Sequence, residues 1–242
     1  MHQETPVESL ATTSFLNSAQ LCALRADMGY FRNYSKSASA VPWALAIDAE
    51  LAAWEENCPA AHKFTNMTTT EKSEFLYEDY FHVYSSLTMV TIWNEHRRTR
   101  ILCHEIVLQH LPHLIQHRSD YPDLTIPLKE MEAQMRESSE VIERVARDIC
   151  ASVPFHFGVH LGMDLKPGGP ATLAPKALCG NLLLRPLFMA GEPRFVSDGV
   201  RKWAIGRLGR IAELMGVKQG ASLAHLIKIG VDPDQWEDTI RD

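Results

Sequence analysis

The longest unbroken helical pattern in the chain is residues 77–111, YEDYFHVYSSLTMVTIWNEHRRTRILCHEIVLQHL. Seven positions recur there at steps of four and three, which places them on one face of a helix. They are Val90, Asn94, Arg97, Ile101, His104, Leu108 and Leu111. Three of the seven are polar, whereas Glu95, Arg98 and Gln109 fall on other faces and are expected to be solvated. Since a buried polar group without a partner costs about 1–3 kcal/mol, this helix is either the frame of a buried polar network or the wall of a pocket.

The chain is expected to divide into a lead-in, residues 1–41, and a helical domain, residues 42–242. The lead-in contains a helical pattern with Ser14 as its cap, followed by a linker of small residues at 33–41. Pro42 is expected to open the next helix, because proline is tolerated in a first helical turn.

This next helix has apolar residues at steps of four, four and three, and it is expected to end before Pro59. The apolar residues are Trp43, Ile47, Leu51 and Trp54. Asp48 and Glu50 lie off that stripe and are expected to face solvent.

The rest of the chain is also helical in pattern. Pro112 is expected to break or kink the long helix, since it removes a backbone donor. Further helices are predicted over residues 128–152, 177–193, 200–215 and 222–229. In the first of these the buried face is Met131, Met135, Ser138, Ile142, Val145 and Ile149. In the third it is Val200, Ala204, Leu208, Ile211 and Met215, with Gly216 as the C-cap. Because alternating β pattern is almost absent, the predicted fold is all-α, with antiparallel helices packed around the central long helix.

Composition and charge exclude several classes of protein. The 242 residues are 45% hydrophobic and 22% charged, which is typical of a globular domain. The formal net charge of −6 argues against direct nucleic-acid binding. No run of about 18 apolar residues could span a bilayer, and the N-terminus lacks the order of a secretory signal. We therefore expect a cytoplasmic protein, or alternatively a nuclear one, that does not contact membranes.

No motif for a metal or a cofactor is present. The five cysteines lie far apart, without a C-x-x-C pair. His113 and His117 have the spacing of a metal-binding pair, but no third ligand lies at motif spacing, so a His-rich surface turn is expected. The Gly/Pro-rich loop at residues 163–176 lacks the order of a phosphate-binding loop and is expected to be a mobile connector or a lid. We expect neither a metal nor a cofactor.

Five phrases of the sequence together resemble a known family. They are IDAELAAWEENCP (47–59), YFHVYSSLTMVTIWNEHRRTRILCHEIVL (80–108), ICASVPFHFG (149–158), LLLRPLFMAGE (182–192) and RKWAIGRLGRIAELMGVKQG (201–220). In this order they resemble the C-terminal regulatory region of fungal binuclear zinc-cluster transcription factors. The resemblance runs from about residue 42 to 229. It implies an all-helical domain that senses metabolites or contacts the transcription machinery.

Two departures from the family pattern bear on function. Cys22 and Cys58 are the only cysteines in the first hundred residues, so the family's DNA-reading zinc cluster cannot be built there. Arg185 stands where the family usually has Trp before Pro-Leu, which puts a cation at a packed aromatic position. The chain therefore resembles the regulatory half standing alone.

Two hypotheses follow. In the first, the helical domain binds a small, largely apolar metabolite and acts as a cofactor-independent, pericyclase-like cyclase or isomerase in fungal secondary-metabolite biosynthesis. Its catalytic residues are Arg97, His104 and Arg185, and its substrate-binding residues are Asn94, Trp93, Tyr84 and His156. In the second, it is a non-DNA-binding or truncated regulator that senses a metabolite or binds a protein partner. Formation of a homodimer is left open.

Each of these residues also has a structural interpretation. Asn94, Arg97, His104 and Glu105 match family positions and can equally form a hydrogen-bond and ion-pair network. Trp93 and Tyr84 have the spacing of core residues, and His156, beside a proline, that of a packing or capping residue. These alternatives stay open at the level of the sequence.

Overall fold

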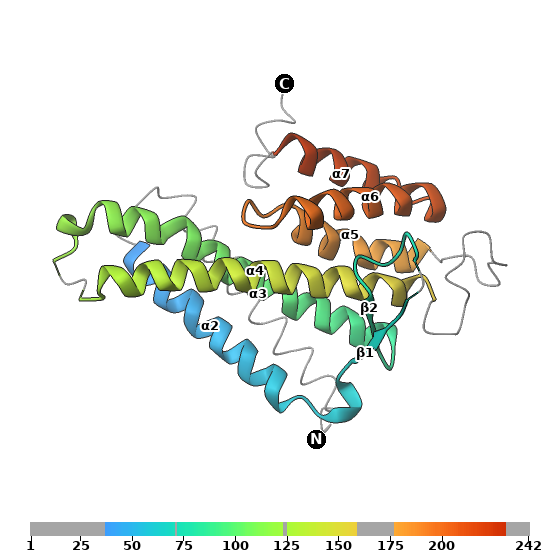
Figure 1. Ribbon diagram of the computed structural model, residues 1–242, viewed down its shortest axis with the longest axis horizontal. Helices are drawn as coiled ribbons and strands as arrows, with labels where there is room; N and C mark the ends of the chain where they lie inside the picture. Colours follow the sequence, from blue (N-terminus) through green and yellow to red (C-terminus); the bar gives the residue numbers. More distant parts are fainter. Residues whose placement is uncertain (1–36, 71, 123–124, 159–176, 231–242) are drawn as a thin grey trace, which may run out of the picture. The chain divides into compact units, whose positions relative to one another are not determined.

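The computed structural model describes residues 37–70, 72–122, 125–158 and 177–230 (Figure 1). The helix expected in the lead-in and the connector at residues 163–176 lie outside these ranges.

The described residues form six α-helices, one pair of short strands and two 3-10 turns. In chain order they are α2 (Ser37–Asn57), η2 (Ala60–His62), β1 (Thr65–Thr68), β2 (Tyr80–Val83), α3 (Leu87–Gln116), η3 (Arg118–Asp120), α4 (Leu128–His156), α5 (Ala177–Gly191), α6 (Asp198–Met215) and α7 (Gln219–Ile229). The predicted all-α class is confirmed.

The long helix begins later than the sequence predicts. β1 and β2 pair antiparallel, with Thr65 opposite Val83 and Thr68 opposite Tyr80. The hydroxyl of Ser86 then accepts a hydrogen bond from the backbone nitrogen of Met89 at 3.2 Å, which caps the first turn of α3. The prediction of a helix from residue 77 is therefore wrong before Leu87, because residues Tyr80–Val83 form a strand paired with β1.

The helix that contains Trp43 ends at Asn57, before Pro59 as predicted, whereas prolines inside the helices do not end them. Pro112 lies inside α3, which continues to Gln116, so the long helix does not stop at Leu111. Pro42 lies inside α2, which begins at Ser37 rather than at the proline. A proline inside a helix removes one backbone hydrogen bond, and tertiary packing of the rest of the helix can outweigh that loss.

The polar stripe of α3 is buried, as predicted. All seven of its positions, from Val90 to Leu111, are inaccessible to solvent, and Gln109 is exposed. Arg98 was expected to be solvated, and this is wrong: it is 3% exposed. Its guanidinium donates to the carboxylate of Glu95 one turn earlier. The middle of α3 is buried on almost every side, so no face remains for solvated charges.

The chain forms two compact units. Unit 1 comprises residues 1–58 and 95–144, and unit 2 comprises residues 59–94 and 145–242. The boundary passes through both α3 and α4, so each of these helices contributes one part to each unit. On α4, the predicted face is buried in both units except at Met135, which is half-buried.

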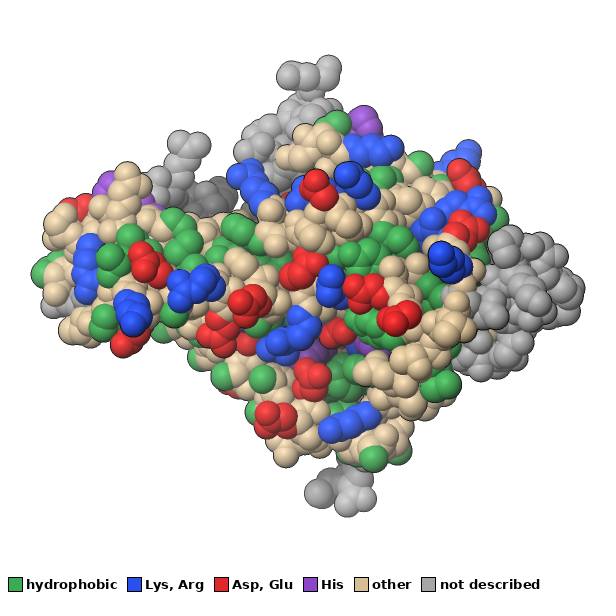
Figure 2. All heavy atoms as spheres, in the orientation of Figure 1, with side chains coloured by type: hydrophobic (Ala, Val, Ile, Leu, Met, Phe, Trp, Pro, Cys, Tyr) green, Lys and Arg blue, Asp and Glu red, His purple; other side chains and the backbone are tan. Residues whose placement is uncertain are grey.

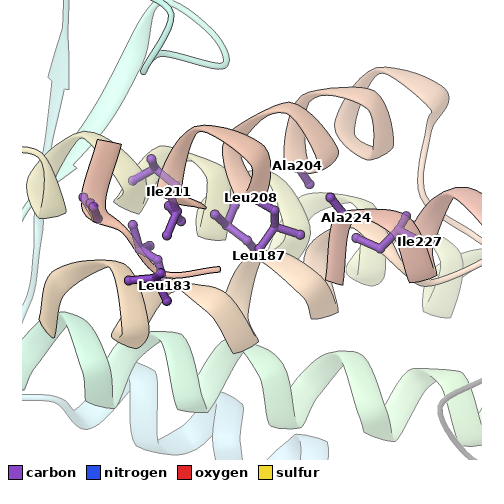
Figure 3. Close-up of a cluster of buried hydrophobic side chains, with 10 residues drawn as sticks. Leu183, Leu187, Ala204, Leu208, Ile211, Ala224 and Ile227 are labelled. Atoms are coloured by element: carbon purple, nitrogen blue, oxygen red, sulfur yellow. The ribbon is translucent and has the colours of Figure 1, made fainter. Parts of the chain in front are cut away.

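In unit 2, α5, α6 and α7 pack around a common apolar core (Figure 3). Its members are Val153, Leu183, Leu187, Ala204, Leu208, Ile211, Met215, Val217, Ala224 and Ile227. The face of α6 predicted from the sequence is confirmed. Close approach of the helices requires glycine at Gly220, where an added Cβ would overlap the carbonyl oxygen of Leu208.

The limits of α6 agree with the sequence signals. The Ser197 hydroxyl accepts a hydrogen bond from the backbone nitrogen of Val200, and Gly216 follows the helix with φ of 70°. This left-handed conformation confirms Gly216 as the predicted C-cap.

The visible surface mixes charges of both signs. Figure 2 shows Lys and Arg side chains interspersed with Asp and Glu over the described residues of one face. Among the described residues, no helix combines the length and the apolar composition that crossing a membrane requires.

Candidate functional site

Unit 1 contains a buried ion network centred on Asp48 of α2. The guanidinium of Arg100 donates to both carboxylate oxygens of Asp48, from Nε at 2.7 Å and from Nη2 at 3.1 Å. Nε2 of His104 lies 3.1 Å from Oδ2 of the same carboxylate. The other ring nitrogen of His104, Nδ1, is hydrogen-bonded to Oγ of Ser138 on α4 at 3.0 Å. These four residues, called here the Asp48 network, tie α2, α3 and α4 together.

The Asp48 network keeps its carboxylate ionised. Burial alone raises the pKa of Asp48, but the polar contacts with His104 and Arg100 outweigh burial and hold this pKa well below its usual range. Burial likewise lowers the pKa of Arg100, and the hydrogen bonds and charge of Asp48 more than offset it, so this pKa is raised. The pair is therefore charged at neutral pH.

Sequence reasoning missed Asp48, which was expected to face solvent. Its side chain is 14% exposed and belongs to the network. A signal was present: Ala44, Asp48, Leu51 and Glu55 recur at steps of four, three and four, which defines a second face of α2. Ala44 and Leu51 on that face are buried, so Asp48 lies between two core positions.

Unit 2 contains a second buried polar contact on α3. The side-chain amide of Asn94 donates to Oγ of Ser152 on α4 at 3.0 Å, and Ser152 donates to the carbonyl of Ile149 at 2.7 Å. Both side chains are inaccessible to solvent. Asn94 is therefore bound to α4 by a hydrogen bond within its own unit.

A chain of ring contacts runs through unit 2. The ring of Phe64 lies 4.9 Å from Trp93, edge to face, and 5.6 Å from Tyr84. Tyr84 contacts Phe155 at 5.3 Å, again edge to face. Phe155 in turn lies 6.4 Å from the ring of its neighbour His156. We call Phe64, Trp93, Tyr84 and Phe155 the aromatic cluster; such edge-to-face pairs stabilise beyond the area that they bury.

His82 joins the aromatic cluster to a carboxylate. Its ring stacks on Phe64 at 4.2 Å between centroids. Its Nδ1 lies 3.2 Å from the hydroxyl oxygen of Tyr84, and its Nε2 lies 3.9 Å from Oδ1 of Asp148. The hydroxyl of Tyr84 and the ring of His82 are within reach of proton transfer, and the carboxylate of Asp148 is a negative charge near the other side of the ring. The sequence could have indicated this contact, because Tyr80, His82 and Tyr84 alternate along the chain as residues on one face of an extended segment do.

His156 differs from the other buried groups. It is 3% exposed, and neither ring nitrogen has a hydrogen-bond partner among the residues that the structure describes. Burial lowers the pKa of His156 to about 4, so the ring is neutral at physiological pH. It lies one turn after Ser152 on α4, and both belong to the buried part of that helix.

The residues singled out from the sequence are therefore divided between the units. The predicted substrate-binding residues Asn94, Trp93, Tyr84 and His156 all belong to unit 2. Among the predicted catalytic residues, Arg97 and His104 are buried in unit 1. The third, Arg185, is exposed on α5, so the expectation that it occupies a packed aromatic position is wrong. The apolar side of α5 faces its core, and Arg185 falls on the opposite side, which also exposes Leu178 and Asn181.

In the described part of the chain, no three His, Cys, Asp or Glu side chains are arranged to hold a metal ion. The rings of His113 and His117 lie 4.3 Å apart at the end of α3. Comparisons of the sequence with family models and with curated proteins, and of the fold with solved structures, find no match.

Proposed function

We propose that this chain is a helical regulatory domain that binds a small, largely apolar molecule and does not turn it over. One observation carries the proposal: the four residues singled out for binding belong to one unit, where ring contacts connect Trp93, Tyr84 and His156. Aromatic and apolar side chains with a few polar groups are the usual lining of sites for such molecules. The resemblance to zinc-cluster regulators points to the same kind of domain.

The use of His104 argues against turnover. Its two ring nitrogens lie against Asp48 and Ser138, so it stabilises the packing of unit 1 instead of facing a substrate. Arg185 is exposed to solvent, where a cation is screened and stabilises developing charge poorly. Two of the three residues proposed for catalysis are thus in surroundings that suit other roles.

Equilibrium dialysis of the purified 242-residue chain against an apolar extract of a filamentous fungus tests the proposal. We expect a compound to be retained and recovered chemically unchanged by mass spectrometry and chromatography. Trp93→Phe, which reduces the ring surface of the aromatic cluster, should lower retention several-fold. Trp43→Phe, on α2 in unit 1, is the matched control and should retain the compound as the wild type does. No retention, or equal loss in both variants, would refute the proposal.

The regulatory role has its own assay. The full chain is fused to a heterologous DNA-binding domain that controls a reporter gene in yeast. Addition of the retained compound should change reporter expression, and the DNA-binding domain without the fusion should not respond. A compound that binds but leaves expression unchanged would contradict a sensing role.

One observation favours a second candidate, a cofactor-independent isomerase or cyclase. His82 can accept the proton of the Tyr84 hydroxyl, and the carboxylate of Asp148 can stabilise the imidazolium. In the dialysis experiment this function would return the compound with the same mass and a changed retention time. Tyr84→Phe would abolish the conversion of the compound, because it removes the hydroxyl that is hydrogen-bonded to His82. Tyr80→Phe is the control and should leave the conversion intact, since the ring of Tyr80 lies 5.9 Å from that of His82 and its hydroxyl does not take part in this hydrogen bond. Such turnover would replace the regulatory proposal.

A further inference from the structure

The imidazole of His156 is a buried group in need of a partner. Both of its ring nitrogens are shielded from solvent, and neither meets a donor or an acceptor among the described residues. Buried polar side chains are nearly always hydrogen-bonded, and each exception calls for an explanation. Its neighbours on α4, Val153, Pro154 and Phe155, are buried and apolar, so they offer the ring packing but no side-chain hydrogen bond.

Three other buried histidines of this protein each have one ring nitrogen in a hydrogen bond. His96 is 2% exposed, close to the value of His156, and its Nε2 donates to the carbonyl of Leu51 at 2.9 Å. His82 is bonded to the hydroxyl of Tyr84, and His104 to that of Ser138. Burial is the same in all of these cases, so the missing partner, and not burial, distinguishes His156.

The chemistry of the imidazole limits which groups can form its missing hydrogen bonds. A neutral imidazole presents one N–H donor and one nitrogen acceptor, and burial favours this neutral form at His156. A carboxylate can only accept and would also lose its hydration in an apolar place. A hydrocarbon can do neither. An uncharged hydroxyl or amide both donates and accepts, and it matches either tautomer of the ring.

We infer that the molecule bound by unit 2 carries an uncharged hydroxyl or amide group, and that a ring nitrogen of His156 binds this group next to the aromatic cluster. The inference rests on the proposed binding function and adds the chemical class of its ligand. His156 then selects among apolar molecules by their polar group, while the rings of Tyr84 and Phe155 select for an apolar body.

Four small aromatic probes test this inference on the full chain: phenol, benzamide, benzoate and toluene. Their dissociation constants are measured by titration, and the ring nitrogens of His156 are followed by nitrogen-15 NMR. We expect phenol and benzamide to bind at least tenfold more tightly than benzoate and toluene. We also expect them to shift the nitrogen signals of His156.

His156→Phe keeps an aromatic ring and removes both nitrogens. This variant should bind phenol and toluene equally, whereas His96→Phe, the matched control in unit 1, should keep the wild-type preference. The NMR arm needs no variant, so the inference stays testable if His156→Phe does not fold. Equal binding of phenol and toluene to the wild type would overturn the inference, as would a preference that survives in His156→Phe. Ring signals already typical of a hydrogen bond, and unmoved by phenol, would assign the partner to a buried water and also overturn it.

The outcomes separate this inference from the function on which it rests. If the compound retained from the fungal extract binds His156→Phe as tightly as the wild type, the inference fails and the proposed function stands. If neither the probes nor any compound of the extract binds, both fail. If a compound is converted, the proposed function fails, and the preference for phenol still decides the role of His156.

Discussion

Replacing Asp48 by alanine is expected to destabilise the protein strongly. The change removes the two Asp48 oxygens that accept from the Arg100 guanidinium, at 2.7 and 3.1 Å, and with them the carboxylate 3.1 Å from His104. Breaking a buried ion pair on one side costs about 3–5 kcal/mol, because a buried charge remains without compensation. The side chains here are 10% and 14% exposed, and Glu55 remains 3.5 Å from Nη1 of Arg100. We therefore expect a loss near the lower end, about 3 kcal/mol.

Urea denaturation followed by circular dichroism at neutral pH measures this loss. Glu50→Gln is the matched control, since Glu50 is exposed on the same helix and should change stability by less than about 0.5 kcal/mol. The double variant Asp48→Leu with Arg100→Met should recover most of the loss, because replacing both charges with apolar side chains removes the unpaired cation. A loss below about 1 kcal/mol in Asp48→Ala would refute the structural role of the Asp48 network. It would also return His104 to the candidates for catalysis.

Three further outcomes are expected. Burial lowers the pKa of both His96 and His156 to about 4. Between about pH 6.5 and pH 4, these histidines are therefore protonated in the unfolded chain and neutral in the folded one. Stability should therefore fall as pH decreases from about 6.5 to about 4, by about 1.4 kcal/mol per pH unit for each histidine, and a urea titration that shows no slope would contradict this. Gly220→Ala should cost about 1–3 kcal/mol by overlap with a backbone carbonyl of α6, whereas Gly206→Ala, with nothing within 4 Å, should gain up to about 1 kcal/mol, both read from urea midpoints. Arg185→Leu should leave the thermal midpoint and ligand retention unchanged because Arg185 is exposed; a loss of retention would assign it to the site.

The periodicity of the sequence predicted burial well and strand pairing poorly. Every position of the stripe on α3 is buried, and so is the predicted face of α6. The β-hairpin was missed because Tyr80–Val83 continues the helical spacing of the residues that follow. Its partner, Thr65–Thr68, is exposed at every position and has no alternation that could reveal a strand. Such a strand forms because it pairs with a segment distant in the sequence, and the pattern of neighbouring residues does not reveal that pairing.

The same limit applies to the candidate site. The sequence identified Asn94 and His104 as buried polar residues, but their partners Ser152 and Ser138 lie 58 and 34 positions further along the chain. Asp48 lies 52 positions before Arg100. Whether a buried polar side chain lines a pocket or forms a network depends on those partners. Helical spacing defines the face on which a side chain lies and says nothing of what that face meets.

Ligand binding at a buried histidine that lacks a hydrogen-bond partner can also regulate the domain, because it changes the stability of the helix that carries the histidine. A buried polar group without a partner lowers the stability of the folded state by about 1–3 kcal/mol. His156, which is such a group, is the last residue of α4. A ligand at a hundredfold excess over its dissociation constant stabilises the state that it binds by about 2.7 kcal/mol. These two magnitudes are comparable, so occupancy can change the stability of this end of α4 by as much as the missing hydrogen bond costs. The ring of His96 already donates from one nitrogen to the carbonyl of Leu51, so a ligand has less to add there than at His156. Coupling of this kind needs no catalytic group, which is why the partner of His156 bears more directly on the function of this domain than the charge of Arg185 does.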